Sequence, residues 1–212
     1  CAHAGKEAIA PLLGEFRGDD LDRRDAAATV LRRLGWRPQD RKSRLLMLTA
    51  LHRWQVLRLM GEAVVPALIG TLRAERRAAL VHLEGDHRAD VRVAIAQTLG
   101  QLPGSAAANA LVEAMRADPS QKARAAAQLA LKKLGTDGVA ALVQALSTEL
   151  DLAASPSAPR GPSGAAVPSR AGIRQQLVHA LARMKSLDAL EALLRIVSHD
   201  PAPATRAAAS DA

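Results

Sequence analysis

Aromatic residues, cysteine and long apolar runs are scarce in this chain of 212 residues. The aromatic side chains are Phe16, Trp36 and Trp54, and there is no tyrosine. This scarcity argues against a β-sandwich or barrel, whose strands favour aromatic and β-branched residues. It also argues against functions that need an aromatic cage or a base-stacking platform.

A single cysteine, Cys1, excludes an internal disulfide framework and a cysteine-based zinc site. No run approaches the ~20 apolar residues that cross a bilayer, so we expect no membrane span. Cytoplasmic localisation is expected, because the cysteine usage suits a reducing compartment and no signal peptide is recognisable. The position of Cys1 leaves a bacterial lipoprotein as the alternative, since such proteins begin with cysteine after processing.

Alanine and leucine dominate the composition, with 46 and 31 residues. Both favour helices, so the composition predicts packed helices. The formal net charge is +8 and it is uneven along the chain. Residues 17–58 carry 11 basic and 5 acidic side chains, whereas residues 136–212 carry 7 of each. A surface for an acidic partner is therefore expected in the N-terminal third.

One pattern recurs along the chain: an arginine, six residues, a leucine, two residues, and then leucine or methionine. It begins at five arginines, the last copy being cut short: Arg24, Arg92, Arg124, Arg174 and Arg206. The apolar pair lies on one helical face, and the small residues before it let another helix approach closely. Three glycines that follow the pattern are typical of helix C-caps: Gly35, Gly100 and Gly135.

A shorter apolar helix precedes each copy, so every unit is predicted to be an antiparallel helical hairpin. The hairpins are expected at about residues 6–35, 36–60, 61–103, 105–135, 136–184 and 186–212. The 32 residues from Arg92 to Arg124 give the period of an all-α solenoid with about five to six stacked hairpins. We expect one such domain over residues 1–212, truncated at its C-terminus because Ala212 lies inside a second helix.

Two hairpins carry insertions between their helices. Residues 147–172 contain four prolines among serine, glycine and alanine, and this composition predicts a flexible loop. Residues 73–90 are rich in charge and are expected to extend the first helix as far as Leu83. Turns of one type line one edge of a solenoid, so we hypothesise a binding edge there. Its residues would be Arg73, Arg76, Arg77, His82, His87 and Arg88, and the alternative is a tolerated surface insertion.

The sequence lacks the common catalytic and metal-binding motifs, including phosphate loops, Gly-x-Ser-x-Gly and His-Glu-x-x-His. His82 and His87 are five residues apart, a spacing that does not place both on one helical face, so a solvated loop is expected in preference to a metal site. Asp19, Asp20, Asp22 and Asp25 predict a capped helix start in preference to a calcium site. We therefore expect a non-enzymatic protein with no cofactor and no metal.

The repeated segments resemble HEAT repeats, specifically the bacterial HEAT-like repeats named after phycobilisome lyases. The resemblance covers most of the chain outside the insertions and rests on residues 90–92, on 122–126, and on Leu131-x-x-Leu134-Gly135. It implies that the five repeated arginines form a ladder with aspartates of neighbouring repeats, and Asp90 and Asp118 are the candidate partners. Direct contact of these arginines with a ligand is the alternative.

This resemblance favours a scaffold or adaptor that binds another protein along the solenoid surface. The alternative is a nucleic-acid-binding solenoid, because some HEAT-like solenoids are DNA glycosylases and the N-terminal third is basic. The residues of that face would be Arg23, Arg32, Arg33, Arg37, Arg41 and Arg44. A remote alternative, implied by the family name alone, is a subunit similar to phycobilin lyases.

Overall fold

The computed structural model describes residues 7–81, 86–154 and 170–211. Its packing divides the chain into a first unit, Cys1–Thr98, and a second unit, Leu99–Ala212. The described residues form twelve α-helices and one short 3-10 helix, and none of them lies in a strand. This confirms the predicted all-α class.

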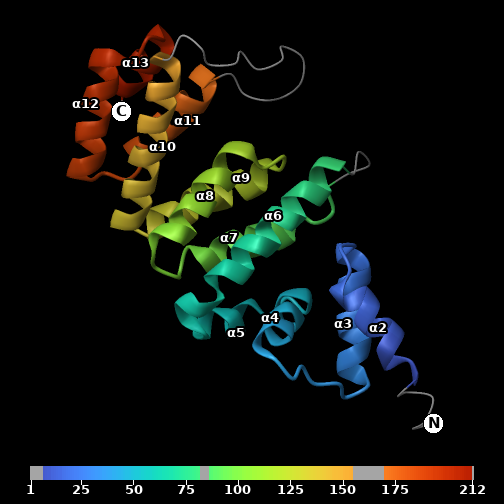
Figure 1. Ribbon diagram of the computed structural model, residues 1–212. Coiled ribbons are helices and arrows are strands. Elements are labelled where there is room, and N and C mark those ends of the chain that lie inside the picture. The colour runs from blue at the N-terminus through green and yellow to red at the C-terminus, as the bar shows by residue number, and fades with distance from the viewer. Residues whose placement is uncertain (1–6, 82–85, 155–169, 212) are drawn as a thin grey trace. The chain divides into compact units, whose positions relative to one another are not determined.

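The first unit contains six helices and the 3-10 turn, and its last helix ends one residue beyond the unit boundary. These elements are α2 (Ile9–Arg17), α3 (Leu21–Arg33), α4 (Arg41–Ala50), α5 (Trp54–Leu59), η1 (Gly61–Val64), α6 (Val65–Val81) and α7 (Ala89–Leu99). Figure 1 shows α2 and α3 side by side, and α3 packs in turn on α4. From α2 to α5, each helix thus packs on the next one along the chain, and α4 also packs on α6.

Aspartates begin two of these helices. The side chain of Asp20 accepts the N–H groups of Asp22 and Arg23 at 3.1 and 3.0 Å, so it caps α3 as the acid cluster predicted. Asp40 caps α4 in the same way and accepts the Ser43 N–H at 2.8 Å. The hydrogen bonds from the backbone and hydroxyl of Ser43 hold the pKa of Asp40 below its usual range.

The core of the first unit uses two of the three aromatic residues of the chain. Phe16 is fully buried among Ala27, Ala28 and Leu31, and Trp36 packs against this cluster. The rings of Phe16 and Trp36 meet edge to face with centroids 5.8 Å apart. Small alanines on α3 let α2 approach closely enough for this packing.

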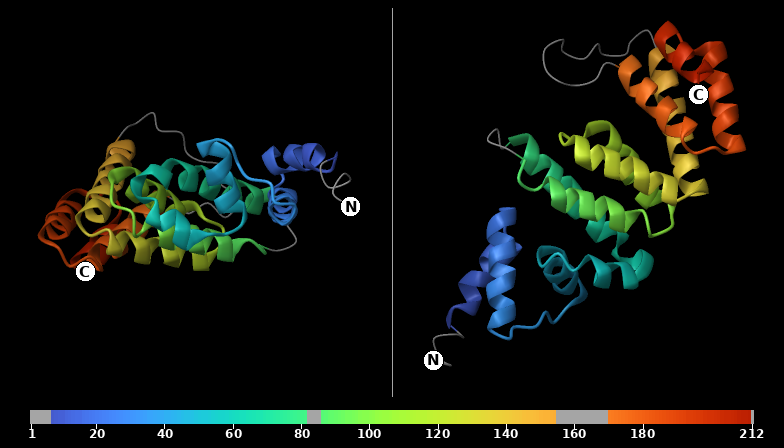
Figure 2. Two further views of the ribbon diagram at one scale, coloured as in Figure 1. Left: turned by 90° about the horizontal axis from the view of Figure 1, so that it is seen from below. Right: turned by 180° about the vertical axis from the view of Figure 1, so that it is seen from behind.

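The second unit continues the same arrangement. Its helices are α8 (Ser105–Ala117), α9 (Gln121–Lys133), α10 (Thr136–Ala154), α11 (Arg170–Ala182), α12 (Leu187–His199) and α13 (Pro203–Ser210). Each first helix packs on its hairpin partner, and α10 also packs on α8 and on α12. The pairing of α12 with α13 is visible from two further directions in Figure 2.

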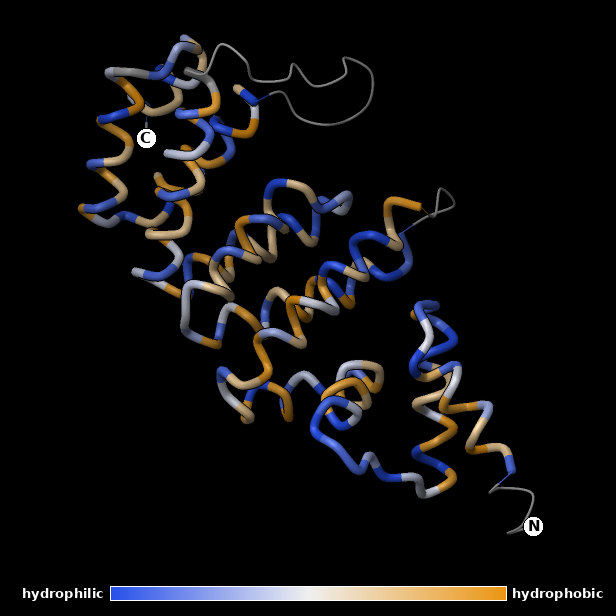
Figure 3. Tube along the Cα trace, in the orientation of Figure 1, coloured by the Kyte–Doolittle hydropathy of each residue, from blue (hydrophilic) through white to orange (hydrophobic). Residues whose placement is uncertain are grey.

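Alternating apolar and polar positions explain the core of the second unit. Figure 3 shows hydrophobic and hydrophilic residues alternating along its helices. The leucines of the repeated pattern, Leu131 and Leu181, are fully buried, as are Leu111 and Leu142 on the preceding helices. The apolar pattern found in the sequence is therefore the buried face of each helix.

Two helices lie within each of the six predicted hairpin ranges, but the insertions differ from expectation. Helix α10 continues to Ala154, so the prediction of a loop from residue 147 is wrong over residues 147–154. Alanine and leucine sustain the helix until the chain approaches Pro156, the first of the four prolines. Helix α6 extends into the first insertion as far as Val81, whereas the predicted end at Leu83 falls in residues 82–85, which lie outside the described residues, as do residues 155–169.

One of the three predicted C-cap glycines has a different role. Gly35 and Gly135 adopt the left-handed φ values of +75° and +59° that such caps need. Gly100 has no positive φ; a Cβ atom there would lie 2.6 Å from the Cβ of Ala130. The C-cap interpretation of Gly100 is therefore wrong, because this glycine makes room for α9.

Candidate interaction surfaces

An ion-pair cluster centred on Arg88 joins α3 to α6 in the first unit. The Nε and Nη2 atoms of Arg88 donate to the two carboxylate oxygens of Glu75, each at 2.6 Å. Arg88 also donates to Asp25 at 2.7 Å and to Asp22 at 2.6 Å. The side chains of Arg88 and Glu75 are 11% and 2% exposed, so this bidentate pair is shielded from water.

The charges of this cluster shift the pKa values of its members. Hydrogen bonds to Glu75 and then Asp25 raise the pKa of the Arg88 guanidinium, although desolvation opposes the shift. Partial burial would raise the pKa of Asp22, but the hydrogen bond and charge of Arg88, helped by His87, lower it. The cluster therefore holds its arginine charged and its Asp22 carboxylate ionised.

Two histidines contact the same carboxylates. His87 Nε2 lies 3.3 Å from Asp22 Oδ2, and His52 Nε2 lies 3.2 Å from Asp25 Oδ2. His52 also stacks on Trp54, with ring centroids 5.4 Å apart. The sequence analysis expected His87 and Arg88 at a binding edge, and the structure brings both of them to the acids that begin α3.

The other residues of the predicted binding edge are placed differently. Arg73 and Arg77 are exposed on α6, and Arg76 is half-buried there. His82 lies outside the described residues. The proposed edge therefore retains exposed cations on α6, whereas the Arg88 side chain is buried in the ion-pair cluster.

Four of the five repeated arginines bind the segment six residues before them. Arg24, Arg124 and Arg206 donate to the main-chain carbonyls of Gly18, Asp118 and Asp200, at 2.7, 2.7 and 2.6 Å. Arg92 is fully buried and donates instead to the carboxylate of Asp86, with one bond of 2.8 Å. Hydrogen bonds from Arg92 lower the pKa of Asp86 against partial desolvation. These arginines thus fix the turn between the two helices of their own hairpin.

The fifth repeated arginine links two hairpins. Arg174 on α11 donates through Nε and Nη2 to the carboxylate of Asp200, at 2.7 and 3.2 Å. Asp200 follows α12, and both side chains are nearly inaccessible, at 4% and 0% exposed. This is a rung of the ladder that the resemblance implied, with a partner that the sequence analysis missed. Spacing in the sequence could have identified this partner. Asp200 lies six residues before the repeated Arg206, just as Asp118 lies six residues before Arg124.

The six arginines of the alternative nucleic-acid face are all exposed in the first unit. Arg23 lies near two acids, with N–O distances of 3.8 Å to Glu15 and 3.4 Å to Asp20. Arg41 donates to the Ala63 carbonyl at 3.3 Å. Arg32 lines an open groove of about 550 Å³ together with Arg53 and Thr29, beside the Asp25–His52 pair.

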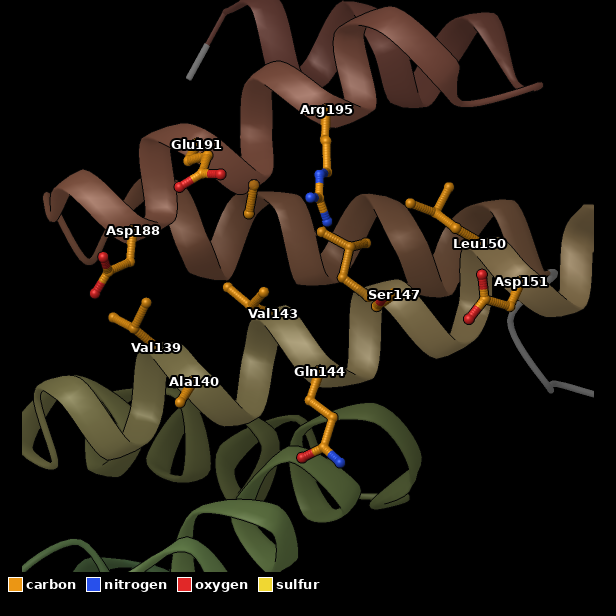
Figure 4. A pocket seen from close by; sticks show the side chains of 12 residues that line it. Val139, Ala140, Val143, Gln144, Ser147, Leu150, Asp151, Asp188, Glu191 and Arg195 are labelled. Atoms are coloured by element: carbon orange, nitrogen blue, oxygen red, sulfur yellow. The ribbon is translucent and has the colours of Figure 1, made fainter.

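A second groove, of about 660 Å³, lies between α10 and α12 in the second unit. Its floor is apolar, and Figure 4 shows Val139, Val143 and Leu150 of α10 there. Its rim is polar and mainly acidic, formed by Asp151, Asp188, Glu191 and Arg195. Sequence reasoning missed this groove because its residues come from different hairpins, and Ser147, Leu150 and Asp151 were assigned to a loop.

In residues 7–81, 86–154 and 170–211, no three histidine, cysteine or acidic side chains are grouped so that they could hold a metal ion. No helix in the described part of the chain is long and apolar enough to cross a membrane.

Stacked helical hairpins joined by a buried arginine–aspartate pair define this chain as an α-solenoid of repeats. Residues 49–132 match the HEAT repeats family. The chain therefore contains HEAT repeats, and the predicted resemblance is confirmed over that segment. No curated protein matches the chain. HEAT repeats are commonly protein-interaction scaffolds and are generally non-enzymatic, whereas the narrower phycobilisome-lyase resemblance stays a prediction.

Proposed function

We propose that this protein is a non-enzymatic scaffold or adaptor that binds another protein through the groove between α10 and α12. The observation that carries the proposal is the lining of that groove. Valines and leucines form its floor, and acidic side chains dominate its rim. Such a lining accepts apolar side chains of a partner, while the rim favours basic residues beside them.

The dimensions of the groove also support a macromolecular partner. The groove is open and runs along two helices, so it can receive several side chains of a helix or an extended segment. The hairpins on both sides are held by fully buried leucines and by the Arg174–Asp200 pair. A rigid framework lowers the entropy that is lost when a partner binds.

The test is capture from a lysate of the source organism by the immobilised chain, with and without nuclease. Val143→Arg places a long charged side chain in the groove. Ala125→Arg is the control, because it introduces the same side chain at an exposed position of α9 outside the groove. We expect the chain to capture a protein partner whether or not nuclease is present. The Ala125→Arg variant should still capture this partner, whereas the Val143→Arg variant should not. Equal capture by both variants would contradict the groove as the binding site.

The second candidate is nucleic-acid binding by the first unit, and the exposure of all six predicted arginines favours it. Capture that vanishes with nuclease would support this function. Affinity for a short DNA duplex should then fall linearly with the logarithm of salt concentration. Replacement of Arg32 and Arg33 by glutamine should reduce the slope by about 2, because each phosphate contact contributes about one unit.

A further inference from the structure

The groove between α10 and α12 is acidic at both of its ends and carries a cation between them. Asp188 and Glu191 of α12 lie toward one end of the apolar floor, and Asp151 of α10 lies at the other end (Figure 4). Arg195 of α12 projects between these two ends. The charges along the groove therefore follow the order negative, positive, negative.

The three carboxylates of the groove differ from the acids that hold the fold together. Glu149 and Asp200, in the same unit, are nearly inaccessible and form ion pairs with arginines. Within the described residues, by contrast, no ion pair engages Asp151, Asp188 or Glu191, and all three are exposed. Because the net charge of the sequence is +8, the chain as a whole does not attract a basic partner, and any such attraction is local to these acids.

The floor of the groove lies between two hairpins that are both described. Leu111 and Leu142 are the equivalent, fully buried leucines of α8 and α10, so residues 31 apart correspond in these two helices. Helix α10 packs on α8, and Val112 of α8 is only 5% exposed. Its equivalent on α10, Val143, lines the groove and is half-buried. The apolar floor is therefore accessible although the next hairpin is in place.

The walls of the groove decide which kind of segment fits it. Both walls are helices, whose backbone groups bond within the helix, so they offer no strand edge to an extended peptide. The lining contains no aromatic residue, which a groove for proline-rich segments needs. Its single arginine, Arg195, does not form the arginine cluster that binds phosphorylated segments. Of these recurring modes of recognition, the lining fits a helix lying in a groove.

The spacing of the floor sets the length and the pattern of such a helix. Intervals of four, three and four residues form one ridge along α10, made by Val139, Val143, Leu146 and Leu150. Helices pack by placing the ridge of one into the groove beside the ridge of another, so a partner helix needs apolar residues at similar intervals. From the first to the last of these side chains the ridge rises about 16 Å, or three turns.

We propose that the occupant of this groove is an amphipathic helix of a partner protein, about three turns long, with basic residues in its first and last turns and none between them. This inference rests on the proposed function and names the chemistry of the partner. Each basic turn faces one acidic end of the groove, while Arg195 repels a cation placed between them. A uniformly basic helix lacks this pattern, and the phosphates of a nucleic acid are repelled by the acidic ends.

The test is selection from a phage-displayed library of three-turn helices held on a stable helical scaffold, with the surface positions randomised. The library is depleted on the Val143→Arg variant and then selected on the immobilised full chain. We expect the enriched helices to carry apolar residues at intervals of four and three, with lysine or arginine in the first and last turns. Enrichment of acidic, uncharged or uniformly basic helices, or of none, would overturn the proposal.

The affinity of the most enriched helix tests the acidic ends directly. It is labelled on its scaffold and titrated with the full chain by fluorescence anisotropy. Asp188→Asn with Glu191→Gln should weaken binding about threefold to tenfold, because exposed ion pairs each contribute modestly. Glu62→Gln with Asp211→Asn is the matched control, since it removes two exposed carboxylates outside the groove and should bind like the wild type. Equal binding by both double variants would contradict a role for the acidic ends.

The failure of this inference can be distinguished from the failure of the proposed function. All four positions of the two double variants are exposed, and far-UV circular dichroism verifies that the variants fold. Capture of a protein that depends on Val143, together with a selection that yields no helix with basic ends, would overturn this inference alone. Equal capture by Val143→Arg and Ala125→Arg would overturn the proposed function, and with it the partner that this inference names.

Discussion

Two shielded charge pairs in the described residues join segments that lie apart in the sequence. Arg174 and Asp200 are 26 residues apart, and the buried Glu75 and its partner Arg88 are 13 apart. A buried arginine without its carboxylate keeps the cost of desolvation and loses the compensating attraction. These side chains should therefore be sensitive to single substitutions.

Replacement of Arg174 by methionine should destabilise the second unit by about 3–5 kcal/mol, because it leaves the buried Asp200 carboxylate without that partner. Urea unfolding followed by far-UV circular dichroism measures the change. Arg183→Met is the control, since Arg183 is exposed and donates to Gln128 at 3.2 Å, and it should change stability by less than about 1 kcal/mol. Equal losses in the two variants would show that the Arg174–Asp200 pair has no special role.

The lowered pKa values of Asp22 and Asp86 predict how the first unit responds to acid. A carboxyl with a lower pKa in the folded chain stabilises the fold above its unfolded pKa, about 3.9, and this contribution is lost as pH falls through the folded pKa. We expect the free energy of unfolding of this unit to decrease from about pH 5 to about pH 2.

Asp86→Asn should be less stable than the wild type at pH 7 and should approach it near pH 2, because both then lack the carboxylate. Urea unfolding followed by tryptophan fluorescence at several pH values tests this. Glu62→Gln removes an exposed carboxylate from the same unit and should keep the wild-type slope. A slope unchanged by Asp86→Asn would exclude a contribution of the Arg92–Asp86 pair to acid sensitivity.

At the scale of the helices, periodicity in alanine and leucine was enough to place the hairpins. The pattern beginning at Arg124 predicted a helix whose Leu131 is fully buried in α9. The same reasoning placed the start of the second loop too early, because composition was averaged over residues 147–172. The helix-forming residues up to Ala154 decide the local structure, and only Pro156 and the prolines after it oppose a helix.

The close approach of two helices at Gly100 could not be predicted from the sequence. A glycine at the end of a helical pattern is typical both of a helix C-cap and of a close contact between helices, and only the position of the neighbouring helix distinguishes these two roles. An added Cβ would lie 2.6 Å from Ala130 Cβ and 2.7 Å from Ala130 Cα, so α9 would have to move. The contact is therefore a property of two hairpins and is invisible in either one alone.

Gly100→Ala should destabilise the second unit by about 1–3 kcal/mol, the usual range for an overpacked core. Gly70→Ala is the control, since a Cβ at Gly70 meets no atom within 4 Å, and alanine is the better helix former. That change should stabilise α6 by roughly 0.5–1 kcal/mol. Chemical unfolding measures both, and a neutral Gly100→Ala would show that α9 yields at little energetic cost.

For the whole molecule, the sequence predicted the fold and the kind of repeat better than the contacts between individual side chains. The repeat pattern extends over many positions, so the loss of any one of them leaves it recognisable. The groove between α10 and α12 and the Arg88 cluster each depend on a few side chains from separate hairpins. Their pairing depends on the stacking of hairpins, so no local pattern identified Glu75. Asp200 could have been found only from its place six residues before the repeated Arg206.

The two units offer separate spectroscopic signals. Trp36 and Trp54 are the only tryptophans of the sequence, and both belong to the first unit. Tryptophan fluorescence therefore reports the unfolding of residues 1–98, whereas far-UV circular dichroism reports helices of both units. In repeat proteins, stability is approximately a sum of local terms, so a local substitution should affect the two signals unequally.

The substitution Arg88→Ala should make the fluorescence and dichroism signals change at different urea concentrations. It leaves the buried Glu75 and the acids of α3 without their shared cation, so the first unit should lose about 3–5 kcal/mol. We expect the fluorescence midpoint in urea to fall below the midpoint of the dichroism, which should become broader or biphasic. Arg77→Ala changes an exposed position of α6, and its fluorescence and dichroism midpoints should still coincide. Coincident midpoints in Arg88→Ala would mean that the chain unfolds as one cooperative body, and the Arg88 cluster would then stabilise the whole solenoid.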